Sequence, residues 1–383
     1  MTKPLQPKTI YINHETKQPV LFMAMELSNS NWKLAFSNGD TNRMKNVTAG
    51  DMDAVKHEIE LAKKRFGLQE EATEVYCCYE AGRDGFWIYH WLCSLGIVCH
   101  VIDSSSIEQN RKNRKAKTDR IDALKLAKLM VRHIATNEPA FSVVQVPDDI
   151  SEDNMELQRE RERLMKAKTR ATNAISALLV KHNVREYELG KGFDESLEQM
   201  RTHDEKPLGK HLKNSLKRLN ALYLFLLGQL DDIEKEKQQR LADHTDEVMG
   251  KVRSLMLLKG VGLQSAWLLV MELFGWRTFK NRRKLAGFVG LTGTPYDSGD
   301  SVRDQGISKA GSRRVRALLV ELSWLWLRHQ PQSDLAQWFE RRFANGGKRM
   351  RRIGIVGVAR KLLIALWRFV EEGTVPQGAV LSA

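Results

Sequence analysis

Two carboxylates spaced three residues apart lie within a strongly basic part of this chain. Asp119 and Asp122 follow a run of arginines and lysines and precede an apolar periodic segment. Residues three apart share one face of a helix, so both carboxylates can reach the same ion. Carboxylates bind divalent cations, and neighbouring cations bind phosphates. The segment therefore predicts a metal-dependent enzyme that acts on phosphodiesters.

Two further carboxylates complete a candidate metal site. Glu26 and Glu80 each end a predicted strand. Because the carboxyl ends of adjacent strands converge at one sheet edge, these residues can meet Asp119 and Asp122 there. The four could hold one or two Mg²⁺ (or Mn²⁺) ions for phosphoryl transfer. Taken alone, Asp119 also fits a helix N-cap, Asp122 a first-turn acid and Glu80 a loop residue. All four at such positions in a basic protein favour the metal site.

Cations gather at three places and predict contacts with nucleic-acid phosphates. They are Arg111, Lys112, Arg114, Lys115, Lys117 and Arg120 beside the acidic pair, Lys259 with Gly260 and Gly262 in a short turn, and Arg303, Lys309, Arg313, Arg314 and Arg316 around a predicted helix start. The short turn is similar to the hairpin of helix-hairpin-helix modules, whose backbone N–H groups meet a DNA phosphate. A plain interhelical turn and solvated basic faces are the alternatives.

Ser298 lies in a glycine-rich stretch, residues 287–301, that we expect to be an irregular loop. A serine attacks phosphorus only when it is exposed, positioned and activated. No nearby histidine offers a base, so a metal or a remote carboxylate would have to activate the hydroxyl. From the residues alone, an ordinary Ser-Gly turn explains the pattern better.

The composition favours a polyanionic partner. The formal net charge is +14 over 383 residues, which indicates nucleic acid first. No apolar run is long enough to span a bilayer and the N-terminus is polar, so we expect a cytoplasmic, nucleoid-associated bacterial protein with no membrane partner. The cysteines lack zinc-ligand spacing, and we expect buried, reduced thiols at Cys77, Cys78, Cys93 and Cys99.

Hydrophobic patterning predicts an α/β region followed by helices. Strands are expected at residues 20–27, 31–36, 46–48, 75–79 and 97–102, with helices at 51–66, 84–95 and 119–133. This order predicts a mixed, RNase H-like sheet. Further helices are expected at 151–184, 212–233, 312–327 and 354–371, and another follows the stretch 257–263 and runs to about 274. Apolar residues of 212–233 repeat as in a coiled coil, which fits an antiparallel arm, a bundle core or a dimer contact.

Two sets of motifs, in this order, resemble the DEDD transposases of the insertion-sequence one-ten family. Glu80-Ala-Gly and Lys117-Thr-Asp-Arg-Ile-Asp-Ala resemble their RuvC-like N-terminal domain. Their C-terminal transposase domain is matched by Gly260-Val-Gly, Leu285-Ala-Gly-Phe-Val-Gly-Leu-Thr, Ser298-Gly and Arg313-Arg-Val-Arg-Ala-Leu-Leu. The resemblance covers most of residues 20–370, although the coiled-coil part matches only in character.

The resemblance implies a recombinase that exchanges DNA strands through a Holliday junction. The acidic tetrad maps onto Glu26, Glu80, Asp119 and Asp122, and the catalytic serine, which forms a covalent phosphoserine, maps onto Ser298. The family implies a homo-oligomer, a dimer or tetramer, in which the tetrad and the serine come from different subunits. It also implies a structured bridge RNA that pairs with donor and target DNA.

We expect four regions, with one departure from the family. They are a polar leader (1–19), the RuvC-like domain (20–147), a coiled-coil helical arm (148–245) and a mainly helical C-terminal transposase domain (246–383). The family usually has aspartate where this chain has Glu26. The longer side chain could be absorbed by a shift, or could change metal preference or impair activity. The rival functions are a metal-dependent nuclease or junction resolvase without covalent serine, and a decayed, nucleic-acid-binding transposase.

Overall fold

The described chain forms two compact units, Met1–Val146 and Pro147–Ala383. The computed structural model describes all residues except 1–10, 12, 14–15, 17, 70–71, 108–118, 137–139, 299–300 and 383; the side chains of 119–121, 295–298 and 301–305 also lie outside the description. Among the residues that the structure describes, no helix combines the length and the apolar character needed to cross a membrane.

The first unit is built on a five-stranded mixed sheet in the order β3-β2-β1-β4-β5. Its strands are β1 (Val20–Glu26), β2 (Asn31–Ser37), β3 (Asn42–Thr48), β4 (Glu74–Glu80) and β5 (Val98–Ile102). The first three are antiparallel, whereas β4 runs parallel to β1, and β5 parallel to β4. This is the expected RNase H-like arrangement. The edge strand β3 begins earlier than predicted. Its start was missed because one of its two buried residues is the charged Arg43, which pairs with Glu58.

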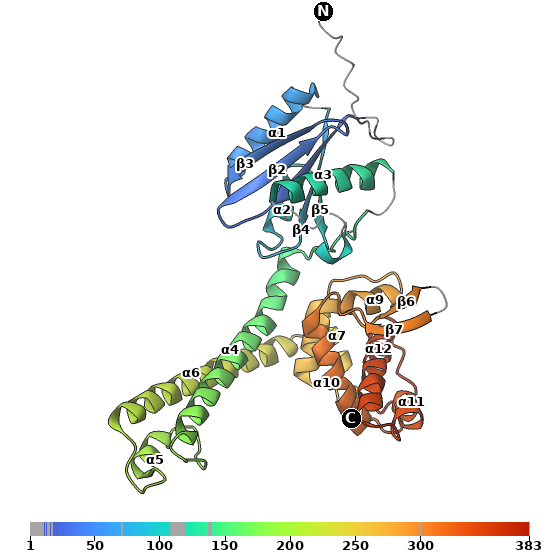
Figure 1. Cartoon of the computed structure of the whole chain (residues 1–383). Coiled ribbons are helices and arrows are strands. Elements are labelled where there is room, and N and C mark those ends of the chain that lie inside the picture. Colours follow the sequence, from blue (N-terminus) through green and yellow to red (C-terminus); the bar gives the residue numbers. More distant parts are fainter. Residues whose placement is uncertain are drawn as a thin grey trace, which may run out of the picture. The chain divides into compact units, whose positions relative to one another are not determined.

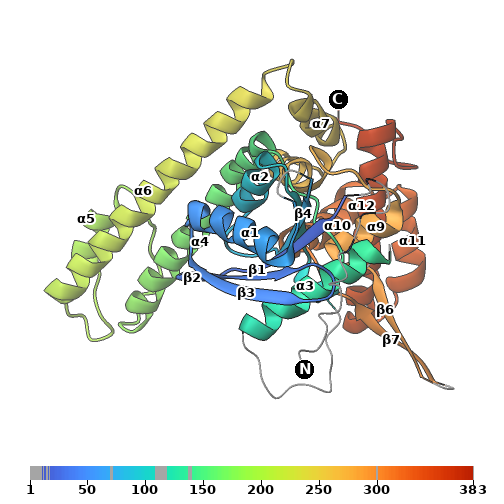
Figure 2. The same ribbon diagram turned by 90° about the horizontal axis from the view of Figure 1, so that it is seen from above.

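Helices cover both faces of this sheet, as Figures 1 and 2 show. They are α1 (Met52–Phe66) and α2 (Trp87–Ser94) on one face and α3 (Asp119–Ala135) on the other, with a short 3-10 turn η1 (Ser104–Ser106) between β5 and α3. Alternate residues of β1 serve the two faces: Leu21 and Met23 pack with α1 and α2, whereas Phe22 and Ala24 pack with α3. Burial on both faces explains the continuous apolar run of this strand.

The second unit begins with two long helices, α4 (Asp149–Val180) and α6 (Lys210–Leu241), joined through the unpredicted helix α5 (Phe193–Gln199). The two long helices pack side by side in opposite directions. Arg161 Nε lies 2.6 Å from Glu234 Oε1, and one turn earlier on α4 Gln158 accepts a hydrogen bond from Lys237, one turn later on α6. The coiled-coil pattern of residues 212–233 is thus packed against α4 of the same chain, as in an antiparallel arm.

The rest of the second unit is a helical body. It comprises α7 (Glu247–Met256), α8 (Leu263–Leu269), the π-helical turn η2 (Val270–Phe274), α9 (Arg282–Val289), α10 (Arg313–His329), α11 (Asp334–Phe343) and α12 (Lys348–Glu372). The start of α10 is capped by a side chain, since the Ser312 hydroxyl accepts a hydrogen bond from Val315 N–H. The basic stretch at 348–352 forms the first turns of α12, which is therefore longer than expected, and α11 was not predicted.

Two expectations are corrected by the structure. Residues 287–301 are not an irregular loop: α9 ends within them, and β6 (Gly293–Ser298) forms an antiparallel hairpin with β7 (Ser301–Ile307). Glycines and a proline concealed the strand, but proline is tolerated in a two-stranded ribbon beside the irregular pairing at 293–295. The second correction concerns Cys93, which is exposed on the outer face of α2, whereas the other three thiols are buried as expected.

Candidate active site

Glu26 and Glu80 end neighbouring strands side by side. The parallel register pairs Met25 of β1 with Tyr79 of β4, so the next residue of each strand is a glutamate. Side chains of a strand alternate between faces. In β4 the residue two before Glu80 is Cys78, which packs against α3, as does Ala24, two before Glu26. Both glutamates therefore belong to the sheet face that α3 covers.

Helix α3 begins beside these strand ends. Cys78 Sγ lies 3.9 Å from the carbonyl oxygen of Leu126, and near the start of β1 the Tyr11 hydroxyl donates a hydrogen bond of 3.4 Å to Ile134 O. The helix therefore runs opposite to β1 and β4, with its first turn toward their carboxyl ends. Asp122 lies in that turn and is partly buried. Asp119 is the first residue of α3, and its side chain lies outside the described residues.

The oxygen ligands of this region suit a hard cation such as Mg²⁺. Glu26, Glu80 and Asp122 share one face and one end of the sheet, yet among the side chains that the structure describes no three acidic, His or Cys groups lie close enough to hold a metal ion. The antiparallel register of β2 sets Lys33 opposite Glu26. The positively charged Lys33 is thus the neighbour of Glu26 on the adjacent strand. Asp119 is the fourth metal ligand that the sequence predicts.

Ser298 lies in the second unit, at the end of a hairpin. It is the last residue of β6, and its Cα partner is Ser301, the first residue of β7. The two residues between them, Gly299 and Asp300, lie outside the described chain, as does the side chain of Ser298. The predicted nucleophile therefore ends the first strand of the ribbon, and a second serine is its Cα partner on the other strand.

The base of the hairpin is fixed where the end of α9 packs closely against the segment before α10 and the start of that helix. We call this contact the interlock. Lys309 N–H donates to Gly290 O at 3.1 Å, and an Arg316 guanidinium nitrogen donates to Val289 O at 2.8 Å. Gly290 and Gly311 both have positive φ, and a Cβ at either would overlap a backbone carbonyl oxygen of the other segment. Only glycine allows this close approach.

The predicted phosphate-binding cations fall into three groups. Lys259, Lys309 and Arg313 are exposed. Arg316 already donates a hydrogen bond to the carbonyl oxygen of Val289, and Arg314 forms ion pairs with two carboxylates. Outside the described residues lie Arg111, Lys112, Arg114, Lys115 and Lys117, together with the side chains of Arg120 and Arg303.

Arg314 joins three helical elements that are distant in sequence. Its guanidinium lies 2.7 Å from Glu162 of α4 and 2.7 Å from Glu272 of η2. Burial lowers the pKa of Arg314, but the hydrogen bonds and charges of these two carboxylates more than offset it and hold the pKa above its ordinary value. A phosphate at Arg314 would have to compete with both partners.

The turn at Lys259, Gly260 and Gly262 links α7 to α8 and packs on the C-terminal segment. Lys259 N–H donates to Val380 O at 3.2 Å, and its carbonyl accepts from the Gln330 side chain at 2.8 Å. Gly260 has φ of +95°, and a Cβ there would lie 3.0 Å from His329 Cβ. The turn is thus held by the protein, while the Lys259 side chain stays exposed.

One polar residue at the junction of the arm and the helical body escaped sequence reasoning. Lys237 of α6 is fully buried; its Nζ donates to Gln158 Oε1 at 2.6 Å and Gln264 Oε1 at 2.8 Å, and lies 5.2 Å from the centre of a Trp267 ring. Burial lowers the pKa of Lys237 to about 8. The sequence carried a signal for this burial, because Lys237 follows Leu230 and Ile233 at the three- and four-residue spacing of the buried face of α6.

Both parts of the chain match known transposases. Residues 252–337 match the family described as "Transposase IS116/IS110/IS902 family", and residues 27–184 match a DEDD transposase family of the IS110 group. A putative transposase, y4rJ, of Sinorhizobium fredii is 37% identical over 375 residues, covering 94% of each chain. The transposase for insertion sequence element IS1328 of Yersinia enterocolitica is 26% identical over 330 residues, covering 84% of this chain and 92% of the relative. The chain belongs to the IS110/IS116/IS902 family of insertion-sequence transposases, which are enzymes of DNA phosphoryl transfer.

Proposed function

We propose that this transposase cleaves and exchanges DNA strands through a phosphoserine at Ser298, assisted by a divalent metal at an acidic tetrad and guided by a structured RNA. The observation that carries the proposal is that Glu26 and Glu80 end adjacent parallel strands on the face covered by α3. The first turn of that helix supplies Asp119 and Asp122. Four carboxylates with these origins are suited to bind Mg²⁺ or Mn²⁺.

The serine step exchanges one phosphodiester for another. Ser298 Oγ gives its proton to a carboxylate or to solvent and forms a bond to phosphorus. The bond from phosphorus to a deoxyribose oxygen breaks, and that oxygen leaves as a hydroxyl after taking up a proton. A hydroxyl of the exchanged strand then attacks the phosphoserine and releases Ser298. A bound metal would stabilise charge on the attacking and leaving oxygens. Glu26, where aspartate is usual, would reach it with one additional methylene.

The partners in this proposal are donor and target DNA, a bridge RNA that pairs with both, and further copies of the chain. The net charge of +14 and the exposed Lys259, Lys309 and Arg313 support contact with phosphates. The acidic residues and Ser298 belong to different compact units. A division of this kind suits an oligomer in which one subunit supplies the tetrad and another the serine.

The test is a denaturation-resistant protein–DNA adduct, formed with Mg²⁺, labelled donor and target DNA, and RNA from the flanking element. The hairpin provides a matched control, because Ser301 lies opposite Ser298. We expect an adduct with the parent and with Ser301→Ala, and none with Ser298→Ala.

Other outcomes separate the rivals. An adduct with Ser298→Ala would remove this residue from the mechanism. Metal-dependent cutting by the parent without any adduct would indicate a nuclease or a junction resolvase. Exchange that proceeds equally well without RNA would overturn the guided mechanism, whereas a folded protein that binds DNA but neither cuts nor forms an adduct would indicate decay.

A further inference from the structure

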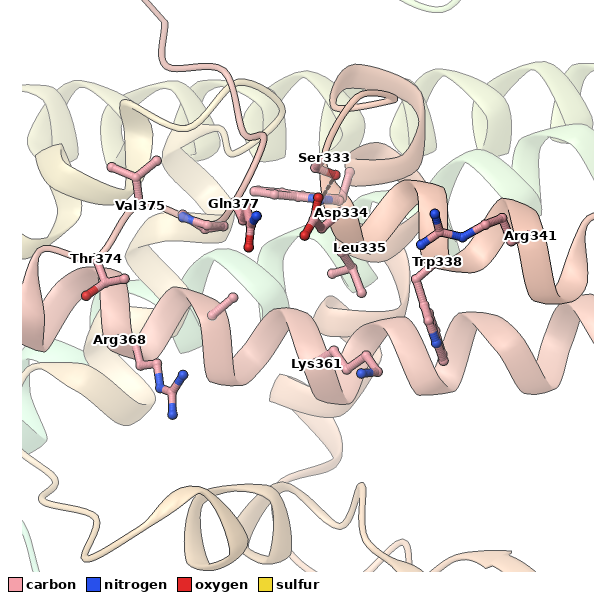
Figure 3. A pocket seen from close by; sticks show the side chains of 13 residues that line it. Ser333, Asp334, Leu335, Trp338, Arg341, Lys361, Arg368, Thr374, Val375 and Gln377 are labelled. Carbon is pink, nitrogen blue, oxygen red and sulfur yellow. Dashed lines mark hydrogen bonds between the residues drawn. The ribbon is translucent and has the colours of Figure 1, made fainter.

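A cavity of about 750 Å³ lies in the helical body, between the start of α11, the middle of α12 and the segment that follows α12. Figure 3 shows its lining. Its floor includes Trp326, which is fully buried and donates a hydrogen bond from Nε1 to Ser333 Oγ at 3.0 Å. The volume falls within the range of ligand sites, roughly 300–1,000 Å³. It contains none of the residues proposed above for strand exchange.

An indole ring stands at one end of this cavity. Trp338 of α11 lies against Gly357 of α12, where a Cβ would be 3.1 Å from the ring, and its ring centre lies 5.3 Å from that of Phe343 at 66°. The absence of a side chain at Gly357 lets the ring lie close to α12. Trp338 nevertheless remains partly exposed and lines the cavity. A ring that is held by its edge and open toward a cavity offers a stacking surface.

Three exposed cations line the same cavity. They are Arg341, Lys361 and Arg368, and none of them forms an ion pair with a carboxylate in the part of the chain that the structure describes. Lys361 Nζ lies 4.8 Å from the centre of the Trp338 ring, so cation and ring act at the same place. Lys361 and Arg368 are two turns apart on α12, roughly 10 Å along the helix axis.

We propose that this cavity binds unpaired nucleotides of a nucleic-acid strand, with Trp338 stacking on one base and Lys361, Arg368 and Arg341 contacting the backbone. Aromatic stacking beside cations is the usual way in which proteins hold single strands. A duplex does not fit this chemistry, because its base faces are covered by neighbouring pairs. Asp334, which also lines the cavity, repels phosphate but can accept hydrogen bonds from the amino group of a base.

The cavity is a nucleic-acid site separate from the residues proposed for strand exchange. The match to the C-terminal family model ends at residue 337, so Trp338 and the whole of α12 lie beyond that model. The inference requires only a transposase that handles nucleic acid, and it does not depend on Ser298. A test by binding therefore stays separate from any test of strand exchange. Unpaired DNA and unpaired RNA offer the same bases and phosphates, so both are used as probes.

The experiment is photocrosslinking of the full chain to a short single strand that carries 5-iodouracil, as DNA and as RNA of the same sequence. We expect a crosslinked peptide that contains Trp338. The double variant Lys361→Ala with Arg368→Ala should weaken binding about tenfold and make the dependence of log affinity on log salt shallower by about 1.4, roughly 0.7 for each phosphate contact. Weaker binding of both the DNA and the RNA probe, or of only one of them, supports the site and identifies which nucleic acid it binds.

Matched variants keep the result clear. Lys166→Ala with Arg170→Ala removes the same charges from exposed positions of α4 outside the cavity, and should change binding little. Trp338→Leu should weaken binding about tenfold, while Trp338→Phe, which keeps a ring, should retain most of it. The proposal is overturned if crosslinks form only elsewhere, or if the Lys361 and Arg368 double variant binds both strands like the α4 control.

Discussion

The two places of predicted chemistry are supported in different ways. Glu26 and Glu80 end strands whose preceding residues are buried on one or both faces of the sheet. Ser298 ends one strand of a two-stranded ribbon, which is held to the helical body through the interlock around Gly290 and Gly311. Carboxylates on a packed sheet keep their spacing without further help, whereas the serine depends on the base of its hairpin. Substitutions of the carboxylates should change chemistry alone, whereas substitutions at the base of the hairpin should change stability as well.

The largest expected effect is at the acidic tetrad. Glu80→Gln should lower metal-dependent DNA cleavage by about 10²-fold or more, because a neutral amide binds a divalent cation poorly. The melting temperature should not fall, since this residue ends its strand and is only partly buried. Cleavage of labelled DNA across a range of Mg²⁺ concentrations measures the loss.

A residue of the same strand provides the control. Glu74 begins β4 and, six residues before Glu80, belongs to the same face of the sheet. At the opposite end of the strand from Glu80, it accepts a hydrogen bond from Asn13. Glu74→Gln should cut DNA like the parent. If both variants are equally active, or equally inactive, the location of the tetrad at the carboxyl ends of the strands is refuted.

The next effect concerns the base of the hairpin. Gly290→Ala should lower the free energy of unfolding of the second unit by about 3 kcal/mol, because its Cβ would overlap Ala310 O in addition to the strain of positive φ. Gly373 also ends a helix with positive φ, but a Cβ there would meet nothing within 4 Å. Gly373→Ala should therefore cost about 1 kcal/mol. Urea unfolding compares the two, and equal losses would show that the interlock does not hold the hairpin.

Sequence patterns predicted most of the sheet because its buried strands carry apolar residues, whereas the start of β3, with the charged Arg43 buried, was missed. The apolar run of β1 reports burial on both faces, and the helix starts at Asp51 and Ser312 are capped by their own side chains. The strand ends then followed, and with them the positions of Glu26 and Glu80. The prediction of a metal site at the four carboxylates remains a prediction.

The parts that were missed depend on residues far away in the chain. Nothing near Arg314 in the sequence shows that Glu162, 152 residues away, will pair with it. The hairpin from Gly293 to Ile307 is hidden because glycine and proline usually interrupt strands. The cavity at Trp338 requires α11 and α12 to meet, and α11 was not predicted at all. Local periodicity therefore finds cores, whereas ion pairs and cavities require the packed structure.

A smaller effect distinguishes the two units by pH. Burial lowers the pKa of Lys237 to about 8, below the ordinary value of 10.5. Between these values the unfolded chain binds more protons than the folded one, so stability rises with pH. From pH 7.5 to 9.5 the gain should be about 2 kcal/mol for the second unit. Lys237→Met should lack this gain and exposed Lys235→Met should keep it; urea midpoints at both pH values that move alike in the two variants would contradict the assignment.

The smallest effect has the same direction, lies at lower pH and belongs to the first unit. Burial lowers the pKa of His100, and the charge of His133, whose ring centre lies 5.9 Å away, lowers it further; burial also lowers the pKa of His133. Because the folded state binds the proton less readily than the unfolded chain, stability is complete above the ordinary pKa of 6.5 and falls as the pH drops below it. His100→Leu should make the unfolding midpoint of the first unit less sensitive to acid, while exposed His244→Leu in the second unit should not. A midpoint of the first unit that declines as steeply in His100→Leu as in the parent would assign acid sensitivity to its carboxylates instead, and the contrast between the two units would then rest on Lys237 alone.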